Sequence, residues 1–423
     1  MSAIDPIKAG NGHPSEDGTK ARNGVVIAGG GLAAQRCAET LRARGYEASI
    51  RIICAEEEAP YDRPPLSKGI LAGDLDAERL HFREADWYAS NGVELILGAR
   101  AAGLDPTTRT VRLEDGCSLT YDDLLIATGA AARSLPLLDG FSNAFPLRTL
   151  ADARRLRSET RAGAQLVIVG AGFIGQEVAS TARAQGAEVT IIEALDLPLR
   201  TVLGADVGRW LVDTHREEGV RVLLSTQIAA AHGNGRVEQL ELAGGERIDC
   251  DAVVVGVGVF PAADWLAGIG LETDGIRTDS SGRTMLPHVY AAGDVCRPYD
   301  QRLGDYARTE HWDAASRQGV AAATAMLGGE PGPAPLPSFW SDQYGLRIQY
   351  AGHAAGADEV RISGEPGNRD FAVLYRRDTR PVAGLAVGRP RELAAMRRLI
   401  EAADETDTQP TEISEAPTKE MIQ

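Results

Sequence analysis

Lysine is scarce in this chain. Only four of its 44 basic residues are lysines, and three of them lie near the two ends: Lys8, Lys20 and Lys419. The fourth, Lys68, stands in YDRPPLSKGI behind two prolines, in a long body whose other positive charges are arginines. Lysine is a compact, strongly hydrated point charge, whereas arginine is a wide planar fork. Lys68 is therefore a candidate functional residue, although a surface lysine at the start of a helix is the ordinary alternative.

The chain also lacks the patterns of a disulfide framework, a metal site and a membrane span. Its five cysteines show no C-x-x-C spacing and its seven histidines form no ligand cluster, so no metal is expected. No apolar run approaches the ~18 residues of a membrane helix. The N-terminal stretch is polar and has no apolar signal region, and residues 1–23 are predicted to be a disordered leader. We expect a cytoplasmic protein that does not enter a membrane.

Negative charge is in excess, with a net charge of -16. Residues 401–423 contain seven acids and one lysine and are predicted to form an acidic disordered tail. An acidic protein is not expected to bind nucleic acid. Phe371 to Ile400, in contrast, carries seven arginines against two acids, which predicts a docking face for an acidic partner. The arginines of that candidate face are Arg376, Arg377, Arg380, Arg389 and Arg391.

A first glycine fingerprint follows directly after the leader. An apolar strand, Val25 to Ala28, is followed by Gly29-x-Gly31-x-x-Ala34, a helix with apolar spacing, and a second strand from Ile50 to Cys54. The first glycine allows a tight turn, the second lets the backbone approach a pyrophosphate, and the small third residue lets helix and sheet pack closely. The helix N-terminus then faces the phosphates. Glu56 follows the second strand and is placed to bind ribose hydroxyls.

A second fingerprint stands 141 residues later. Gly170-x-Gly172-x-x-Gly175 again follows a strand and opens a helix, and Glu193 ends the next strand. Two such units predict two bound dinucleotides rather than two ordinary glycine turns. Glu193 accepts hydrogen bonds from a ribose 2′-hydroxyl but repels a 2′-phosphate, which favours NADH over NADPH. Arg200 lies close in sequence and works against this preference, and a solvated acid after a strand is the plain alternative for Glu193.

Two further segments repeat a design. Asp122 to Ala130 and Asp251 to Ala262 are short apolar strands that end in glycine turns, and each is expected to close one of the two sheets. VYAAGDVC then puts Asp294 after another strand. An acid in this place either binds a ribityl hydroxyl of a flavin or caps a helix.

With these residues assembled, the chain resembles the flavin-dependent pyridine nucleotide–disulfide oxidoreductases. Within that superfamily it is most similar to the ferredoxin reductases of bacterial aromatic-ring dioxygenases and haem monooxygenases. The resemblance runs from Asn23 to about Leu399 and includes YDRPPLSK, LLIATGA, GAGFIGQE, VYAAGDV, EHWDAASRQG and PSFWSDQYGLRIQYAG. The glycine motifs mark only the superfamily, whereas YDRPPLSK and FWSDQYG are specific to the reductases and their near relatives.

The resemblance implies an α/β fold with two Rossmann-like domains and a C-terminal α+β domain. An FAD-binding domain, 24–126 and 254–331, is interrupted by an NADH-binding domain, 127–253. The stretch GGEPGPAPLPS then leads to a C-terminal reductase domain, 332–400. Together with the fingerprints, it implies the following cofactor-binding residues: Gly29, Gly31, Leu32, Ala33, Ala34, Glu56, Arg63, Lys68, Ala127, Thr128, Gly129, Gly170, Gly172, Phe173, Ile174, Gly175, Glu193, Arg200, Gly258, Gly293, Asp294, Glu310, His311, Trp312 and Trp340.

The cysteines argue against thiol chemistry. A disulfide reductase of this superfamily needs a cysteine pair on the first helix, and a peroxidase or oxidase needs one near YDRPP. Cys37 and Cys54 lie 17 residues apart at positions that suit apolar packing. Electrons are therefore expected to pass from NADH to FAD and directly on to a [2Fe–2S] ferredoxin or a rubredoxin. A flavoprotein that signals in its NADH-bound state, like apoptosis-inducing factor, is the alternative from another class.

By the same resemblance Lys68 lies near the flavin and is catalytic together with Glu177. We predict an ion pair between the two that links the cofactor domains; an acid that merely favours a first helical turn is the alternative for Glu177. Arg63 is a candidate partner for an FAD phosphate. Trp340 is placed at the flavin edge that faces the partner protein, with packing in a core as its alternative.

Overall fold

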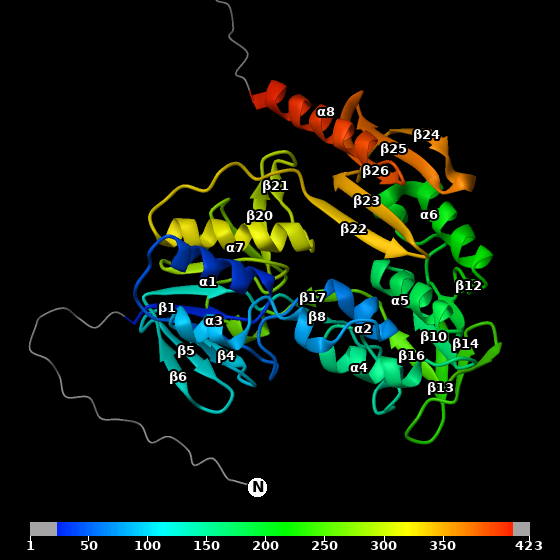
Figure 1. Cartoon of the computed structure of the whole chain (residues 1–423), viewed down its shortest axis with the longest axis horizontal. Helices are drawn as coiled ribbons and strands as arrows, with labels where there is room; N and C mark the ends of the chain where they lie inside the picture. Colours follow the sequence, from blue (N-terminus) through cyan, green and yellow to red (C-terminus); the bar gives the residue numbers. More distant parts are fainter. Residues whose placement is uncertain (1–22, 409–423) are drawn as a thin grey trace, which may run out of the picture.

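The computed structural model describes residues 23–408, which form two parallel sheets with their helices and a C-terminal antiparallel sheet (Figure 1). Except for Asn23, the predicted leader lies outside these residues. The first sheet has the order β19-β7-β1-β2-β3. Its strands are β1 (Val25–Ala28), β2 (Ile50–Ile53), β3 (Val93–Ile96), β7 (Asp123–Ile126) and β19 (Val289–Ala291).

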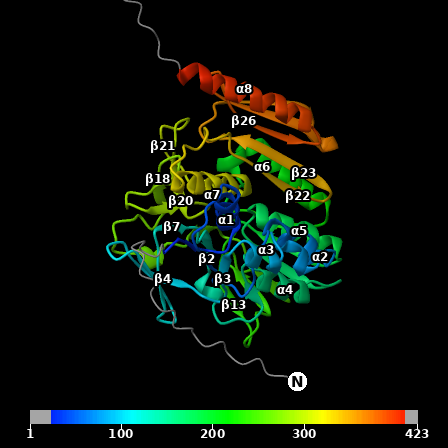
Figure 2. The same ribbon diagram turned by 60° about the vertical axis from the view of Figure 1, so that its left-hand side comes forward.

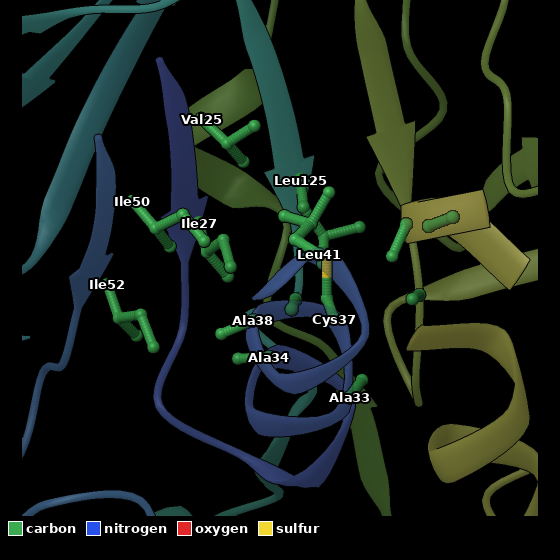
Figure 3. Close-up of a cluster of buried hydrophobic side chains, with 14 of the residues drawn as sticks. Val25, Ile27, Ala33, Ala34, Cys37, Ala38, Leu41, Ile50, Ile52 and Leu125 are labelled. Carbon is green, nitrogen blue, oxygen red and sulfur yellow. The ribbon is translucent and has the colours of Figure 1, made fainter. Parts of the chain in front are cut away.

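The first helix packs on this sheet because its small apolar residues recur with helical spacing. In α1 (Leu32–Ala43) they are Ala33, Ala34, Cys37, Ala38 and Leu41, all buried in one cluster with residues of β1, β2, β7 and the neighbouring helix (Figure 3). Beside α1 runs α7 (Trp312–Met326), and the two views agree on this placement (Figures 1 and 2). A Cβ at Gly319 of α7 would overlap the backbone of Ala33, so a glycine is required for this close contact.

The second sheet repeats the first, with the order β12-β11-β10-β16-β9 and parallel pairing throughout. Its strands are β9 (Ala144–Phe145), β10 (Gln165–Val169), β11 (Glu188–Ile192), β12 (Arg221–Leu223) and β16 (Ala252–Val255). Its helices are α4 (Leu150–Glu159), α5 (Phe173–Ala184) and α6 (Arg200–Glu217). The strands at Asp123 and Ala252, expected to close their sheets, each pair with the fingerprint strand of their own sheet but lie inside that sheet, next to β19 and β9 respectively.

Short sheets surround these two units, two of them antiparallel and the third with both parallel and antiparallel pairing. One contains β4 (Ala101–Asp105), β5 (Thr110–Leu113) and β6 (Ser118–Thr120), and another contains β13 (Ile228–His232), β14 (Gln239–Leu242) and β15 (Arg247–Asp249). A third comprises β18 (Ile276–Thr278), β20 (Cys296–Asp300) and β21 (Asp305–Tyr306). Two short helices, α2 (Gly69–Ala72) and α3 (Ala85–Ser90), lie in the connection from β2 to β3.

The chain passes from one parallel sheet to the other twice, and the two connecting segments pair as a two-stranded ribbon. Here β8 (Ala130–Ala132) pairs with β17 (Val259–Pro261) in antiparallel fashion. The predicted domain boundary between residues 253 and 254 cuts through β16 and is therefore wrong. The strand ends at Val255, after which the chain turns into the ribbon, so the boundary lies between β16 and β17.

The C-terminal sheet lies between two helices and has the order β22-β23-β26-β25-β24. Its strands are β22 (Ser338–Gln343), β23 (Leu346–Gly352), β24 (Glu359–Glu365), β25 (Asp370–Arg377) and β26 (Arg380–Val387). Side chains alternate between its faces, so Tyr350 and Phe371 pack with α6, while Ala351 and Ala372 face α8 (Pro390–Thr408). Because α6 belongs to the second parallel sheet, the C-terminal domain is anchored on that unit (Figure 1).

The predicted tail boundary at residue 400 is also wrong, because α8 continues to Thr408. Asp404, near the end of α8, accepts from Arg302 at 2.5 Å and from Arg380 at 2.8 Å. Arg302 lies between β20 and β21, so this carboxylate ties α8 to the neighbouring domain. The rest of the predicted tail, residues 409–423, lies outside the described residues.

Two of the arginines predicted as a docking face, Arg380 and Arg389, lie at opposite ends of β26, which is about 25 Å long at the usual rise of a strand. Both are neutralised locally, Arg380 by Asp404 and Arg389 by Asp370 and Glu392. The docking face therefore stays a prediction. Within residues 23–408, no helix has the length and apolarity needed to cross a bilayer.

Candidate functional site

The two glycine turns share a geometry that suits a pyrophosphate. Gly29 and Gly170 have φ values of 121° and 98°, and a Cβ at either would overlap a carbonyl oxygen of the neighbouring crossover. Gly31 and Gly172 are the N-cap residues of α1 and α5, without side-chain caps and with open space where a Cβ would point. The first N–H groups of both helices are thus available to an anion. The residues present fit two dinucleotides.

The third position of each fingerprint differs for a packing reason. A Cβ at Gly175 would overlap the carbonyl oxygen of Gly170, so only glycine fits there. Ala34, its counterpart, is fully buried with its methyl group in the core under α1. Leu32 and Ala33 open α1, as Phe173 and Ile174 open α5.

The acid of the second fingerprint is bound to its own glycine turn. Glu193 accepts from the backbone N–H of Ala171 at 2.8 Å through Oε2 and from that of Leu195 at 2.9 Å through Oε1. Arg200, the residue that works against an NADH preference, forms an exposed ion pair with Asp196 instead. Within residues 23–408, Glu193 therefore forms no ion pair with an arginine.

Glu56 and Arg63, predicted as separate ligands of ribose and phosphate, are paired with each other. Arg63 donates to Glu56 at 2.8 Å, and the hydroxyl of Tyr61 donates to the other carboxylate oxygen at 2.6 Å. Arg63 also donates to the carbonyl oxygen of Arg148 at 2.6 Å. The structure thus brings both predicted residues together at the carboxyl end of β2, where each keeps part of its hydrogen-bonding capacity.

Asp294 lies in a turn after β19, as the strand-then-acid pattern predicts. Its carboxylate pairs with Arg148 at 3.0 Å. The preceding Gly293 has φ 82° and donates its N–H to Gln318 of α7 at 2.7 Å. Arg148 was not predicted, because nothing in its local sequence distinguishes it from the many other arginines.

The predicted pair between Lys68 and Glu177 is confirmed, with Nζ 2.5 Å from Oε2. The pair joins α5 of the second sheet to the segment that starts with 3₁₀ helix η1 (Pro64–Ser67), 109 residues earlier. The Glu177 side chain is 4% exposed and that of Lys68 22% exposed. Glu177 also accepts from the hydroxyls of Ser67 at 2.6 Å and Ser341 at 2.8 Å. One buried carboxylate therefore accepts hydrogen bonds from two other parts of the chain, the segment of Ser67 and Lys68 and the strand of Ser341.

Two tryptophans stand near this pair. Trp312, at the start of α7, donates its indole N–H to Asp62 at 2.8 Å. Trp340 of β22 meets Trp312 edge to face, with ring centroids 6.1 Å apart. Burial raises the pKa of Asp62, while the Trp312 hydrogen bond and the charge of Lys68 lower it. The predicted residues Lys68, Trp312 and Trp340 thus belong to one neighbourhood, with Asp62 as a member that the sequence did not single out.

Glu310 and His311 lie just before α7. Glu310 pairs with Arg308 at 2.9 Å, and burial raises its pKa. His311 packs on Phe339 with centroids 4.9 Å apart, and its buried Nδ1 has no hydrogen-bond partner within residues 23–408. Burial lowers the pKa of His311 to about 4. A buried neutral imidazole with an open nitrogen fits the predicted role of binding a polar group of a cofactor.

The remaining predicted residues lie in the two crossovers. Thr128 donates to the carbonyl oxygen of Ala262 at 2.7 Å, and Gly129 and Gly258 have φ values of 69° and 98°. Ala127 precedes them at the end of β7. These contacts fix the crossovers beside the glycine turns.

Four of the five cysteines are buried, and Cys117 is exposed. All five lie among the described residues and are unpaired. Cys37 is fully buried under α1, and burial raises its thiol pKa; burial also raises the pKa of Cys54 to about 12. High thiol pKa values remove the thiolate needed for redox exchange.

Comparison with known proteins gives a consistent result. A pyridine nucleotide–disulphide oxidoreductase family model matches residues 23–319, and a reductase C-terminal model matches residues 338–421. The chain is 39% identical to the ferredoxin–NAD(+) reductase component of an anthranilate 1,2-dioxygenase system from Burkholderia cepacia, over 91% of this chain and 95% of the relative. It is 37% identical to the corresponding subunit of a benzene 1,2-dioxygenase system from Pseudomonas putida, over 90% and 93%.

Solved structures agree with these relatives. The reductase in a covalent putidaredoxin reductase–putidaredoxin complex matches with a TM-score of 0.88 and 33% identity, over 91% of this chain and 94% of that one. A ferredoxin reductase from Rhodopseudomonas palustris matches with a TM-score of 0.83 and 34% identity, over 88% and 92%. The predicted order of an interrupted first domain, an inserted second domain and a C-terminal domain is thus a known arrangement.

Proposed function

We propose that this chain, which belongs to the pyridine nucleotide–disulphide oxidoreductase family, is an NADH:ferredoxin oxidoreductase. The relatives that are ferredoxin reductase components of dioxygenase systems support this proposal, as does the likeness to the putidaredoxin reductase complex. When bound, FAD supplies the chemistry that accepts a hydride from NADH and releases its two electrons one at a time. The acceptor would be a [2Fe–2S] ferredoxin that feeds an oxygenase.

The Lys68–Glu177 pair carries the proposal. Lys68 would hold a compact positive charge against the flavin, where negative charge develops as hydride arrives. Glu177 fixes the ammonium group through a 2.5 Å contact and is itself held by Ser67 and Ser341. The carboxylate is acceptor-only when ionised, so these donors lock its orientation. A fixed ammonium group and raised thiol pKa values together favour direct electron transfer over a thiol relay.

The two glycine turns would bind the two dinucleotides. The turn at Gly29–Gly31 would bind the FAD pyrophosphate, with Glu56, Arg63 and Asp294 beside it. The turn at Gly170–Gly172 would bind NADH, and Glu193 would accept from its ribose hydroxyl and reject a 2′-phosphate. Trp340 and Trp312, at the junction with the C-terminal sheet, would flank the flavin.

We place the reaction in the cytoplasm, the compartment in which thiols are kept reduced. The five unpaired cysteines support this location. The proposal expects full activity in the presence of a thiol reductant.

Purified protein loaded with FAD tests the function by NADH-driven cytochrome c reduction, with and without a [2Fe–2S] ferredoxin. A large ferredoxin-dependent rise in rate is expected. A rise with rubredoxin alone would reassign the partner. A rate that ignores both proteins, together with slow bleaching of the flavin absorbance by NADH, would contradict the proposal and favour a signalling flavoprotein.

A further inference from the structure

A buried chain of hydrogen bonds joins the C-terminal sheet to the second glycine turn. It starts at Tyr344, in the turn between β22 and β23, whose hydroxyl lies 2.6 Å from His215 Nδ1 on α6. The other ring nitrogen of His215 lies 3.4 Å from Gln176 Oε1 on α5. Gln176 then donates through Nε2 to the carbonyl oxygen of Ala171 at 2.8 Å. This series of hydrogen bonds therefore ends at the peptide unit between Ala171 and Gly172.

The direction of donation follows from its last link. Because Gln176 Nε2 donates to Ala171, Oε1 faces His215 and accepts from Nε2–H. Nδ1 is then the unprotonated nitrogen and accepts from the hydroxyl of Tyr344. Burial lowers the pKa of His215 to about 4, so the ring is neutral at pH 7. His215 and Gln176 are 3% and 1% exposed, so water cannot replace a missing partner at low cost.

These hydrogen bonds fix the orientation of the peptide unit that follows Ala171. Its N–H donates to Glu193 at 2.8 Å, while its carbonyl oxygen accepts from Gln176. Because a peptide unit is planar and trans, fixing the Ala171 carbonyl also fixes the N–H of Gly172, which points the opposite way. Gly172 is the N-cap of α5 and faces open space. The network thus fixes the direction of the Gly172 N–H, which is one of the donors available to a bound anion.

The turn that carries Tyr344 has an uncommon backbone conformation, and contacts with the second unit hold it in place. Tyr344 and Gly345 have φ values of 52° and 74°, a pair of left-handed residues in a two-residue hairpin loop. For tyrosine this conformation is uncommon and is kept where the surroundings hold it. The N–H of Tyr344 donates to the hydroxyl of Ser180 on α5 at 2.7 Å. Both the backbone and the side chain of this turn are therefore bound to the second unit.

The same strand also supports the catalytic pair. Ser341 and Gln343 lie on one face of β22, since side chains alternate along a strand. Gln343 donates to the Ser341 hydroxyl at 3.1 Å, and that hydroxyl donates to Glu177 at 2.8 Å. One hairpin of the C-terminal sheet thus fixes both Glu177 and the second glycine turn.

We propose that Tyr344, His215 and Gln176 are positioning residues for NADH, through which the C-terminal domain sets the conformation of the Gly170–Gly172 turn. The inference rests on the proposed function, because it assigns NADH to that turn. It adds that the C-terminal domain, beyond any contact with a partner protein, determines the affinity for the electron donor.

Tyr344→Phe tests the inference, because it removes one hydroxyl and leaves the ring. The rate at which NADH bleaches the flavin absorbance is followed in rapid mixing at increasing NADH, which gives the NADH Kd and the limiting rate separately. The Kd is expected to rise about tenfold, about 1.4 kcal/mol, with little change in the limiting rate or in the KM for ferredoxin. Gln176→Met, which cuts the last link, is expected to raise the Kd in the same way.

Tyr350→Phe is the matched control. It also removes a buried tyrosine hydroxyl of the C-terminal sheet, but that hydroxyl accepts from Ala354 within the same domain. Tyr350→Phe is expected to leave the NADH Kd unchanged. Amide hydrogen exchange in a peptide covering residues 170–175 is expected to be faster in Tyr344→Phe and Gln176→Met than in the control.

The outcomes separate the two proposals. A wild-type Kd in both Tyr344→Phe and Gln176→Met, or an equal rise in Tyr350→Phe, overturns the inference and leaves the proposed function standing. A wild-type protein whose flavin NADH fails to bleach overturns the proposed function as well. A rise in Kd confined to the two network variants, with faster exchange at residues 170–175, supports the inference.

Discussion

Replacing Glu177 by glutamine tests the buried pair most sharply. The change keeps the shape of the side chain and removes the charge that faces Lys68 at 2.5 Å. Removing one partner of a buried ion pair typically costs about 3–5 kcal/mol, since the other charge stays behind. Lys68 keeps 22% of its side-chain surface and a hydrogen bond to the carbonyl oxygen of Pro64, so we place the loss at about 3 kcal/mol, the lower end of that range.

A double-mutant cycle isolates the coupling free energy between Lys68 and Glu177. Lys68→Met removes the ammonium group and retains the length of the side chain, so the pair of changes leaves no unpaired charge. If the cost of Glu177→Gln comes from the stranded lysine, adding Lys68→Met recovers most of it. The assay is the urea midpoint and slope of each FAD-loaded variant, from which the coupling free energy is obtained. Additive losses, with no recovery in the double variant, would refute the reasoning from the buried pair.

Three further outcomes follow from the same structure. Glu193→Gln is expected to narrow the preference for NADH over NADPH, measured as the ratio of kcat/KM values, whereas Arg200→Ala, which removes an exposed ion pair, leaves that ratio unchanged. Burial lowers the pKa of His215 to about 4, so between about pH 6.5 and 4 the unfolded state binds more protons and stability falls as pH falls. That loss is up to about 1.4 kcal/mol per pH unit, and His215→Asn is expected to flatten the pH dependence of the urea midpoint; an unchanged slope contradicts the assignment. Cys37→Ala is expected to keep ferredoxin-dependent turnover within about twofold, because its thiolate is inaccessible, and a loss of activity at unchanged stability would reinstate thiol chemistry.

The glycine fingerprints were predictable because their signals are local. Each consists of a strand, a turn that only small residues allow, and a helix, all within ~30 residues. The strands at Val25 and Gln165 and the exact places of Gly31 and Gly172 followed from this pattern. Asp294 followed from the same reasoning, since an acid after a parallel strand lies at the carboxyl edge of the sheet.

The contact between Lys68 and Glu177 had a different source. Periodicity and spacing cannot bring together two residues 109 positions apart, and the pair was predicted from a family resemblance. Ser341, which completes the coordination of Glu177 from the C-terminal sheet, carries no local signal at all. Arg148 was missed for the same reason, because only the fold shows which arginine meets Asp294.

The wrong tail boundary shows where composition misleads. The acidic composition after residue 400 suggested disorder, but Asp404 is held by Arg302 from a domain about a hundred positions away in sequence. The carboxylate and the arginine neutralise each other, which a count of charges along the sequence does not show.

An anaerobic titration tests whether this chain passes electrons from NADH directly to a one-electron iron–sulfur acceptor. Limiting NADH is added to a catalytic amount of the FAD-loaded protein in an excess of oxidised [2Fe–2S] ferredoxin. Direct transfer reduces about two ferredoxin molecules for each NADH consumed, with the same yield after the accessible thiols are alkylated. NADH consumption without ferredoxin reduction, or a yield abolished by alkylation, would show that electrons do not pass directly to the ferredoxin.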